Sequence, residues 1–266
     1  MSRLGILFFI AILAGACHHF PEQWNLKREK KEIIKEYYPS GRIKSINESV
    51  DNKRHGVCKY YYEDGKLKAI AHFNMNKYQG EQISYYPSGK IRGKVNYDDN
   101  KKHGLSYGYY GDETLYIKEN YEFGRLNGLK QKFYDNGQLM MENHYLDGKP
   151  SIHLKEYDIK GNLITDYPKL VIKPVNRVFL DNTYVLKIYF SNKTRSGNYY
   201  IDELTEGKFL PSYSIPLDKT DRIANYIVEV PPGFVIMKEI KIIASMKTKL
   251  GHTRVVSKSY NLGVKH

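Results

Sequence analysis

The sequence predicts an all-β protein, with an elongated antiparallel sheet of β-hairpin repeats followed by a β-sandwich. Two observations predict this fold. First, aromatic residues recur with a strict spacing of 24 residues, at Tyr37, Tyr61, Tyr85, Tyr109, Phe133 and Tyr157. Second, this period stops near Asp166 and gives way to short alternating apolar segments. A fixed period of this length is typical of repeat arrays, which favours a scaffold or binding surface over an enzyme.

The N-terminus carries a targeting signal. Arg3 precedes an apolar run over residues 4–16, which predicts a signal peptide at 1–16 because the run is too short to span a bilayer. Ala14-Gly15-Ala16-Cys17 resembles a bacterial lipobox. That resemblance implies lipidation of Cys17 and a membrane anchor in the cell envelope. Because no Asp follows Cys17, the resemblance also implies that the anchor lies in the outer membrane. The alternative is ordinary cleavage that leaves Cys17 free.

Residues 17–32 are expected to be a tether. The charged stretch 21–36 could form a short helix or a mobile linker, and Trp24 could cover the open edge of the first hairpin. His18 and His19 have no further ligands nearby, so no metal site is predicted.

Residues 33–167 contain six repeats, each with two tight turns. One turn contains Gly41, Gly65, Gly89, Gly137 or Gly161, with Glu113 in the fourth copy. The other contains Asn52, Asn76, Asn100, Gly124 or Gly148. Gly and Asn tolerate a positive φ, and the residues between the turns favour strands. Each repeat is therefore predicted to be a β-hairpin.

The first turn predicts the register of each hairpin. Pro87 and Gly89 fit a type I turn followed by a glycine bulge, so Tyr86 should oppose Lys90 and Tyr85 should oppose Ile91. Alternation then predicts one packed face. This face would contain the six aromatic residues of the 24-residue period. It would also contain an aliphatic column, Ile43, Leu67, Ile91, Leu115, Leu139 and Leu163, and the aromatic residues Phe73, Tyr97, Tyr121 and Tyr145.

The opposite face is the candidate binding face. It combines tyrosines with basic neighbours: Tyr38, Lys44, Tyr62, Lys68, Tyr86, Arg92, Tyr110 and Tyr134. Aromatic rings and cations suit recognition of a peptide, a glycan or an anionic head group. Cross-strand stacking that only holds the sheet together explains the same residues.

The phrases YYPSGKI (85–91) and NKKHG (100–104) resemble the MORN-repeat variant of bacterial proteins known as YwqK-type antitoxins. The resemblance covers about residues 33–165. It implies an interaction module that binds partner proteins or membranes, and the antitoxin name implies a toxin partner.

Residues 168–266 are predicted to form a β-sandwich, in an immunoglobulin-like arrangement. The expected strands are 170–173, 177–180, 183–190, 198–202, 225–230, 234–245 and 253–260, separated by Asn, Gly and Pro turns. Residues 169–266 hold 16 Lys and Arg against 8 Asp and Glu, so this part could lie against anionic lipid head groups.

No catalytic motif or cofactor site is found in the sequence. The lone Cys58 is expected to pack in a strand, and nucleic acid is not expected as a partner of an exported protein. The sequence therefore predicts a non-enzymatic envelope lipoprotein that acts as a protein-interaction scaffold. The alternatives are a toxin-neutralising antitoxin or immunity-like protein and a glycan-binding module.

Overall fold

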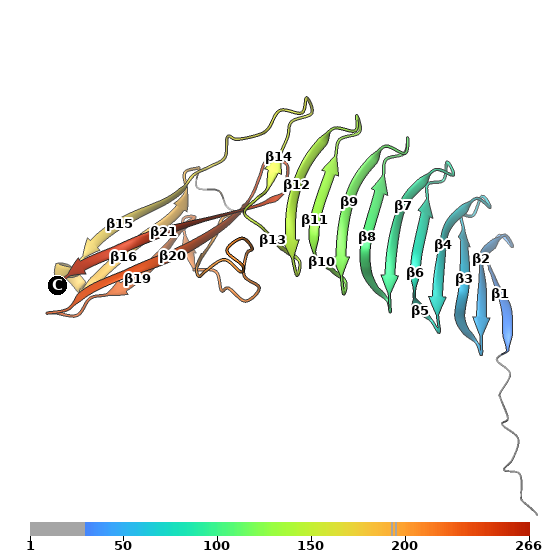
Figure 1. Ribbon diagram of the computed structural model, residues 1–266, viewed down its shortest axis with the longest axis horizontal. Helices are drawn as coiled ribbons and strands as arrows, with labels where there is room; N and C mark the ends of the chain where they lie inside the picture. The colour runs from blue at the N-terminus through green and yellow to red at the C-terminus, as the bar shows by residue number, and fades with distance from the viewer. Residues whose placement is uncertain (1–29, 193, 195) are drawn as a thin grey trace, which may run out of the picture.

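A computed structural model describes residues 30–192, 194 and 196–266 (Figure 1). A long curved sheet of hairpins leads from β1 at one end of the molecule to a smaller β-sandwich at the other. The predictions for the signal peptide 1–16, Cys17, His18, His19, Trp24 and most of the tether lie outside the described residues. No described helix is both long and apolar enough to cross a membrane.

The repeats form one 14-stranded sheet in which sequential strands pair antiparallel, as predicted. Its main strands are β1 (Lys31–Tyr37), β2 (Ile43–Val50), β3 (Lys53–Tyr61), β4 (Leu67–Asn74), β6 (Gly80–Tyr85), β7 (Ile91–Asp98), β8 (Lys101–Tyr109), β9 (Leu115–Glu122), β11 (Gly128–Phe133) and β12 (Leu139–Leu146). Short strands complete it: β5 (Lys77–Tyr78), β10 (Arg125–Leu126), β13 (Lys149–Pro150) and β14 (Lys155–Glu156).

The first strand begins earlier than expected. Lys31 and Glu32 pair with Val50 and Ser49, so β1 includes the last two residues of the predicted tether. The expectation of a helix or mobile linker over 21–36 is therefore wrong for residues 31–36, whose backbone groups form a regular ladder with β2.

The first turn of each repeat has the predicted geometry. The Tyr86 N–H donates to the Lys90 carbonyl at 2.8 Å, and Tyr85 opposes Ile91. Gly89 has φ +88°, which confirms the glycine bulge. In the fourth copy Glu113 occupies the same position with φ +77°, a conformation that is unfavourable for a residue with a Cβ.

The second turn is a two-residue hairpin turn with positive φ at both residues, as in Met75 (+49°) and Asn76 (+71°). It also connects neighbouring repeats. The Asn76 N–H donates to the Arg54 carbonyl, and the Arg54 N–H donates to the Asn76 side-chain oxygen, each at 2.8 Å. Asn100 makes the same pair of bonds with Tyr78. This turn asparagine therefore fixes the preceding repeat as well as its own turn.

The prediction of one continuous packed face is wrong in part, because two irregularities per repeat break the alternation. Tyr60 opposes Ala69 but Tyr61 opposes Leu67, and the same register shift recurs in the other hairpins. A second shift lies at Gly56, whose φ of +96° places three residues of β3 opposite Glu48. Gly80, Gly104 and Gly128 share this positive φ.

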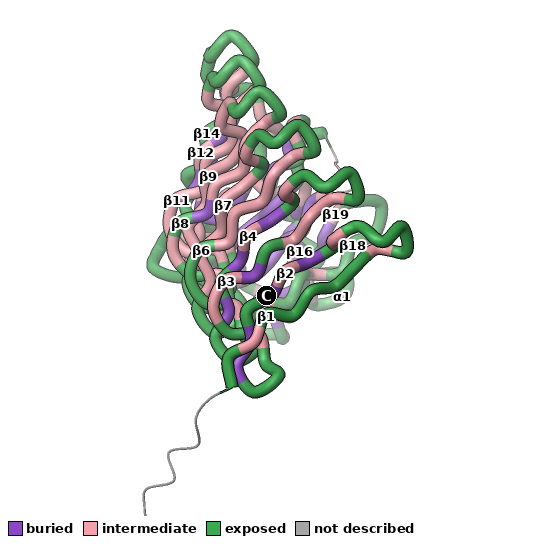
Figure 2. Tube along the Cα trace, turned by 90° about the vertical axis from the view of Figure 1, so that its right-hand side faces the viewer, coloured by how far each residue is buried: buried purple, intermediate pink, exposed green. Residues whose placement is uncertain are grey.

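The buried positions of the sheet are mostly small or polar residues, apart from Val50, Phe73 and Met141. They include Ser45, Asn47, Ser49, Cys58, Ala69, Ala71, Ser106 and Asn143. Tyr37 and Leu163, at the two ends of the predicted columns, are more than half exposed. Most other strand residues are half-buried, as the pink strands of Figure 2 show.

The C-terminal part is a sandwich of two sheets, ordered β15-β16-β19-β18 and β17-β20-β21. Its elements are β15 (Leu170–Arg177), α1 (Val178–Asp181), β16 (Thr183–Phe190), β17 (Asn198–Ile201), β18 (Lys219–Thr220), β19 (Ile223–Glu229), β20 (Val235–Lys247) and β21 (Thr253–Lys265). Leu186, Ile188 and Phe190 from one sheet pack with Ile240, Ile242 and Leu262 from the other, and these form the core.

One predicted strand of this sandwich is wrong. Residues 177–180 do not form a separate strand, because β15 continues to Arg177 and α1 follows. Pro174 does not interrupt β15, since β15 is the edge strand of its sheet and needs no N–H donor on its outer side. Phe179 and Leu180 lie in α1 and face solvent.

The sandwich covers the last hairpin of the array. The Ile152 N–H donates to the Lys208 carbonyl, and the Leu210 N–H donates to the Pro150 carbonyl. At the same junction, Glu156 of β14 is almost fully buried. Its carboxylate accepts hydrogen bonds from the hydroxyls of Thr248 (2.7 Å) and Tyr167 (2.9 Å). It also lies 2.5 Å from His252 Nδ1. The two parts of the molecule are thus joined through a buried carboxylate.

Replacing Glu113 by glycine should stabilise the array by about 1 kcal/mol, because a left-handed residue with a Cβ costs about that much. The urea midpoint of the array measures this gain. The reverse change, Gly89→Glu, places the same side chain at the same turn position and should destabilise the array. A midpoint for Glu113→Gly at or below wild type would contradict this account.

Glu156 predicts acid sensitivity of the junction. Burial raises the pKa of Glu156, but its hydrogen bonds with His252, Thr248 and Tyr167 outweigh burial and leave the pKa below its ordinary value. The stabilisation is therefore complete above the unfolded pKa of about 4.3 and is lost as the pH falls through the lowered pKa of the folded state. Hydrogen exchange at residues 248–252 should accelerate in that range.

In Glu156→Gln the same segment should exchange faster already at neutral pH, because one acceptor oxygen is lost from a buried network. Glu142→Gln is the matched control, since Glu142 pairs with the exposed Lys155 on the neighbouring strand and such a pair contributes little. Equal exchange in both variants would show that Glu156 does not hold the junction.

Candidate interaction surface

Five tyrosines, here called the tyrosine ladder, connect each repeat to the next. They are Tyr38, Tyr62, Tyr86, Tyr110 and Tyr134. Each hydroxyl donates to the main-chain carbonyl 23 residues further on, at Tyr61, Tyr85, Tyr109, Phe133 and Tyr157, over distances of 2.7, 2.8, 2.7, 2.8 and 2.9 Å. The acceptor is in every case the aromatic residue that opens the next repeat. The ladder hydroxyls are therefore committed to the fold.

Burial changes the titration of the ladder phenols. Tyr110 and Tyr134 are half-buried, and burial raises the pKa of both hydroxyls. They remain neutral donors at any physiological pH. The sequence left open whether these tyrosines stack or bind, and their hydroxyl bonds show that they have a structural role.

Cations lie over two of the five ladder rings. Lys68 Nζ is 5.6 Å from the Tyr62 ring centroid, and the Arg92 guanidinium carbon is 6.0 Å from that of Tyr86. Tyr116 replaces the cation beside Tyr110 and meets it edge to face at 5.0 Å. Lys44 is exposed, and no ring contact joins it to Tyr38 in the described part of the chain. The ring faces and the cations are what this surface offers to a partner.

A second aromatic column lies near the other turns of the hairpins. Phe73, Tyr78 and Tyr97 stack in sequence, with centroids 4.3 and 5.1 Å apart. Arg54 covers Phe73 at 4.3 Å, and Lys102 covers Tyr121 at 4.7 Å. Sequence reasoning placed Phe73 and Tyr97 on one face but missed Tyr78 and the two cations. Arg54, Tyr78 and Lys102 are spaced by 24 residues, so the period could have revealed them.

In the later repeats, a largely buried ion pair lies beside Tyr121. Lys130 and Glu119 lie 2.7 Å apart, and the Tyr121 hydroxyl donates to Glu119 at 2.9 Å. Burial first, and then the Glu119 carboxylate, raise the pKa of Tyr121 far above its ordinary value. These contacts join β9 to β11 and pair the Glu119 carboxylate with a lysine and a phenol.

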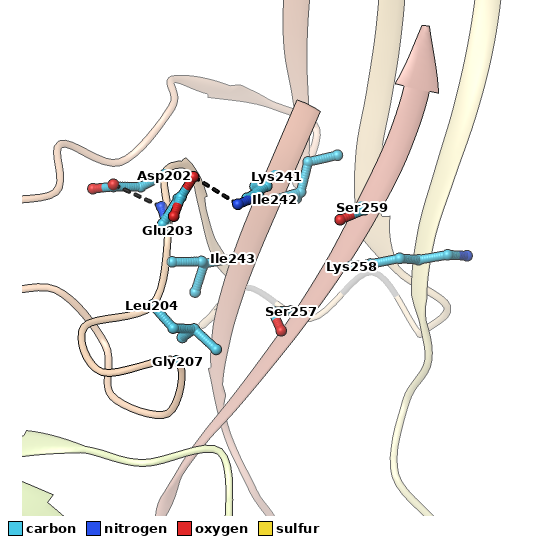
Figure 3. Close-up of a pocket in the computed structure, with 10 residues that line it drawn as sticks. All are labelled: Asp202, Glu203, Leu204, Gly207, Lys241, Ile242, Ile243, Ser257, Lys258 and Ser259. Carbon is cyan, nitrogen blue, oxygen red and sulfur yellow. Dashed lines mark hydrogen bonds and ion pairs between the residues drawn. The ribbon is translucent and has the colours of Figure 1, made fainter. Parts of the chain in front are cut away.

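The described residues show no arrangement with obvious chemistry. They contain no group of three or more His, Cys, Asp or Glu side chains placed to hold a metal ion. Cys58 is fully buried, and burial raises the pKa of its thiol. A hollow of about 340 Å³ beside β20 is lined by the exposed Glu203–Lys241 pair, with Ser257 facing it and Lys258 pointing away (Figure 3).

Comparison with protein families identifies the repeats. Residues 54–75, 78–99 and 126–147 match the family model "MORN repeat variant". The copy between the second and third matches contains Glu113 in place of the turn glycine. No curated protein sequence matches the chain. The chain thus carries MORN-variant repeats, and repeats of this kind often bind proteins or membranes.

Removing one ladder hydroxyl should cost about 1 kcal/mol, the usual contribution of one hydrogen bond. Tyr86→Phe removes the donor but keeps the ring and Arg92 above it. Tyr116→Phe is the control, because the Tyr116 ring lies on the same face and its hydroxyl makes no hydrogen bond with any described residue. Thermal unfolding measures both changes. An equal loss in the two variants would show that the bond to the Tyr109 carbonyl does not stabilise the array.

Proposed function

We propose that this chain is a non-enzymatic scaffold of the bacterial cell envelope that binds a partner protein through the ladder face. The proposal rests mainly on one observation. From β1 to β11 the sheet is a single layer, with no second layer of described residues on either side (Figure 1). A face that carries aromatic rings and cations, and that has no internal partner, is available to another molecule.

Rigidity supports this role. The ladder hydrogen bonds and the second-turn bonds fix every repeat against its neighbour at both ends of the strands. A surface fixed in this way loses little conformational entropy when it binds. Arginine and tyrosine are also the residues that contribute most at the centres of protein interfaces.

The cations favour a protein partner over a glycan. Sugars bind aromatic residues by stacking on the ring face, but Lys68 and Arg92 already lie over the rings of Tyr62 and Tyr86. An acidic side chain of a protein can pair with these cations and leave them in place. We therefore expect a partner with carboxylates spaced to match consecutive repeats.

Site-specific photo-crosslinking in the host tests the proposal. A crosslinker at position 68 or 92 should give one discrete protein adduct, while the same group at Lys77 should give none. Lys77 is the control because it is also exposed but lies at a second turn, paired with Asp99. The adduct should vanish in the variant that combines Lys68→Glu with a crosslinker at position 92.

Other outcomes would decide between the alternatives. Adducts of equal strength at position 77, or none at any position, would contradict a protein-binding ladder face. An adduct with a toxin encoded beside the gene would favour the antitoxin function. Binding to envelope polysaccharide that is lost in Tyr62→Ala/Tyr86→Ala but kept in Tyr62→Phe/Tyr86→Phe would favour the glycan-binding function, because only the alanines remove the rings.

The anchor is part of the proposal, since Cys17 in a lipobox-like sequence would hold the scaffold at the outer membrane. Intact mass and fractionation of the protein from its host test it. We expect an acylated Cys17 and a membrane-bound wild type, and a Cys17→Ala variant that loses both. An unmodified soluble wild type would remove the anchor but leave the ladder face unaffected.

A further inference from the structure

The end of the sandwich farthest from the repeats displays a cluster of apolar side chains to solvent. We call Phe179, Leu180, Phe234, Val235 and Met237 the apolar tip. Their exposed fractions are 82%, 82%, 61%, 57% and 82%. Apolar residues scattered singly over a surface need no explanation, but five gathered at one end of a unit do.

Strand pairing places these residues together. Thr183, just after α1, pairs with Glu229 of β19. Val235 of β20 pairs with Lys265 of β21. The α1 segment, the β19–β20 turn and the end of β21 therefore meet at one end of the sandwich (Figure 1). His266 links them, because its N–H donates to the Phe234 carbonyl and its ring lies 5.6 Å from that of Phe179. The tip is therefore one continuous surface built from three chain segments.

The fold holds this display in place. Val178 is fully buried in the sandwich core, so α1 is anchored by its first residue while Phe179 and Leu180 point outward. Pro231 and Pro232 restrict the backbone of the turn that presents Phe234. Tyr213 and Ile215 are as exposed as the tip residues but lie in another segment of the sandwich, outside the three that form this end.

The sandwich that carries the tip is basic overall, although the charges nearest the tip include the exposed Glu229 and Glu239. Lys238 and Lys265 adjoin Met237 and Val235, and Arg177 precedes α1, where Asp181 pairs with it. The C-terminal part as a whole holds 16 Lys and Arg against 8 Asp and Glu. Two copies meeting tip to tip would bring two sandwiches of net positive charge together, which disfavours a second copy. Apolar side chains that are exposed at the end of a basic domain suit the interface of an anionic bilayer.

We propose that the apolar tip inserts into the interfacial region of an anionic lipid bilayer, with Lys238 and Lys265 at the level of the head groups. This contact is distinct from the ladder face and from Cys17. It gives the molecule a membrane contact at the end opposite β1 (Figure 1). Insertion needs no conformational change, because the side chains are already exposed.

Vesicle co-sedimentation of the full chain tests the proposal, with Cys17→Ala as the background so that no acyl chain contributes. The probe is vesicles of equal parts phosphatidylcholine and phosphatidylglycerol, compared with phosphatidylcholine alone. We expect binding to the anionic vesicles that weakens with salt. Phe179→Ser/Met237→Ser should reduce that binding about tenfold or more, since two apolar side chains no longer leave water.

The matched control is Tyr213→Ser/Ile215→Ser, which removes equally exposed apolar side chains elsewhere and should bind like the background protein. No binding to anionic vesicles, or equal binding by the tip variant, would overturn the proposal. Self-association that only the tip variant loses would assign the tip to a second copy. A photo-crosslink from position 179 to another envelope protein, without vesicle binding, would assign it to a protein partner.

Discussion

The array depends on the hydrogen bond from each ladder tyrosine to the carbonyl that opens the next repeat. A single-layer sheet has no second layer to pack against, so its repeats must be held together by contacts within the sheet. Ladder bonds such as that of Tyr62 hold one end of the strands, and the Asn76–Arg54 bonds hold the other. Because each bond reaches only the neighbouring repeat, stability is a sum of nearest-neighbour terms, as in other repeat proteins.

The two parts of the molecule are stabilised in different ways. The sandwich has an ordinary core in which Leu186, Ile188 and Phe190 are fully buried. The repeat sheet buries mainly small and polar residues and relies on hydrogen bonds, stacked rings and cations. An array of this kind has two open ends, and the sandwich covers one of them through Pro150, Ile152 and the buried Glu156. The junction is therefore the end cap of the array as well as a link between its parts.

Local signals in the sequence were enough to predict the hairpins, because Gly89 and Asn76 report backbone conformations that few residues adopt. Features that depend on non-local contacts, or on backbone conformation within a strand, were not predicted from the sequence. Gly56 lies inside a predicted strand, and the bulge that its positive φ creates there breaks the alternation. Phe179 and Leu180 look like strand residues in an apolar run, and only the fold shows that they are exposed. Glu156 meets His252 across 96 residues, which no local pattern encodes.

The ladder geometry has a consequence for how such a protein can evolve. Each ladder bond joins a tyrosine hydroxyl in one copy to the same main-chain carbonyl of the next copy. A duplicated or deleted stretch of 24 residues therefore leaves every remaining bond with a partner. Each added copy contributes two strands and lengthens the sheet by about 10 Å. The number of copies therefore sets, in fixed steps, how far the sandwich stands from the first strand. The length of the array can therefore change by duplication of one repeat without any change to the structure of its ends.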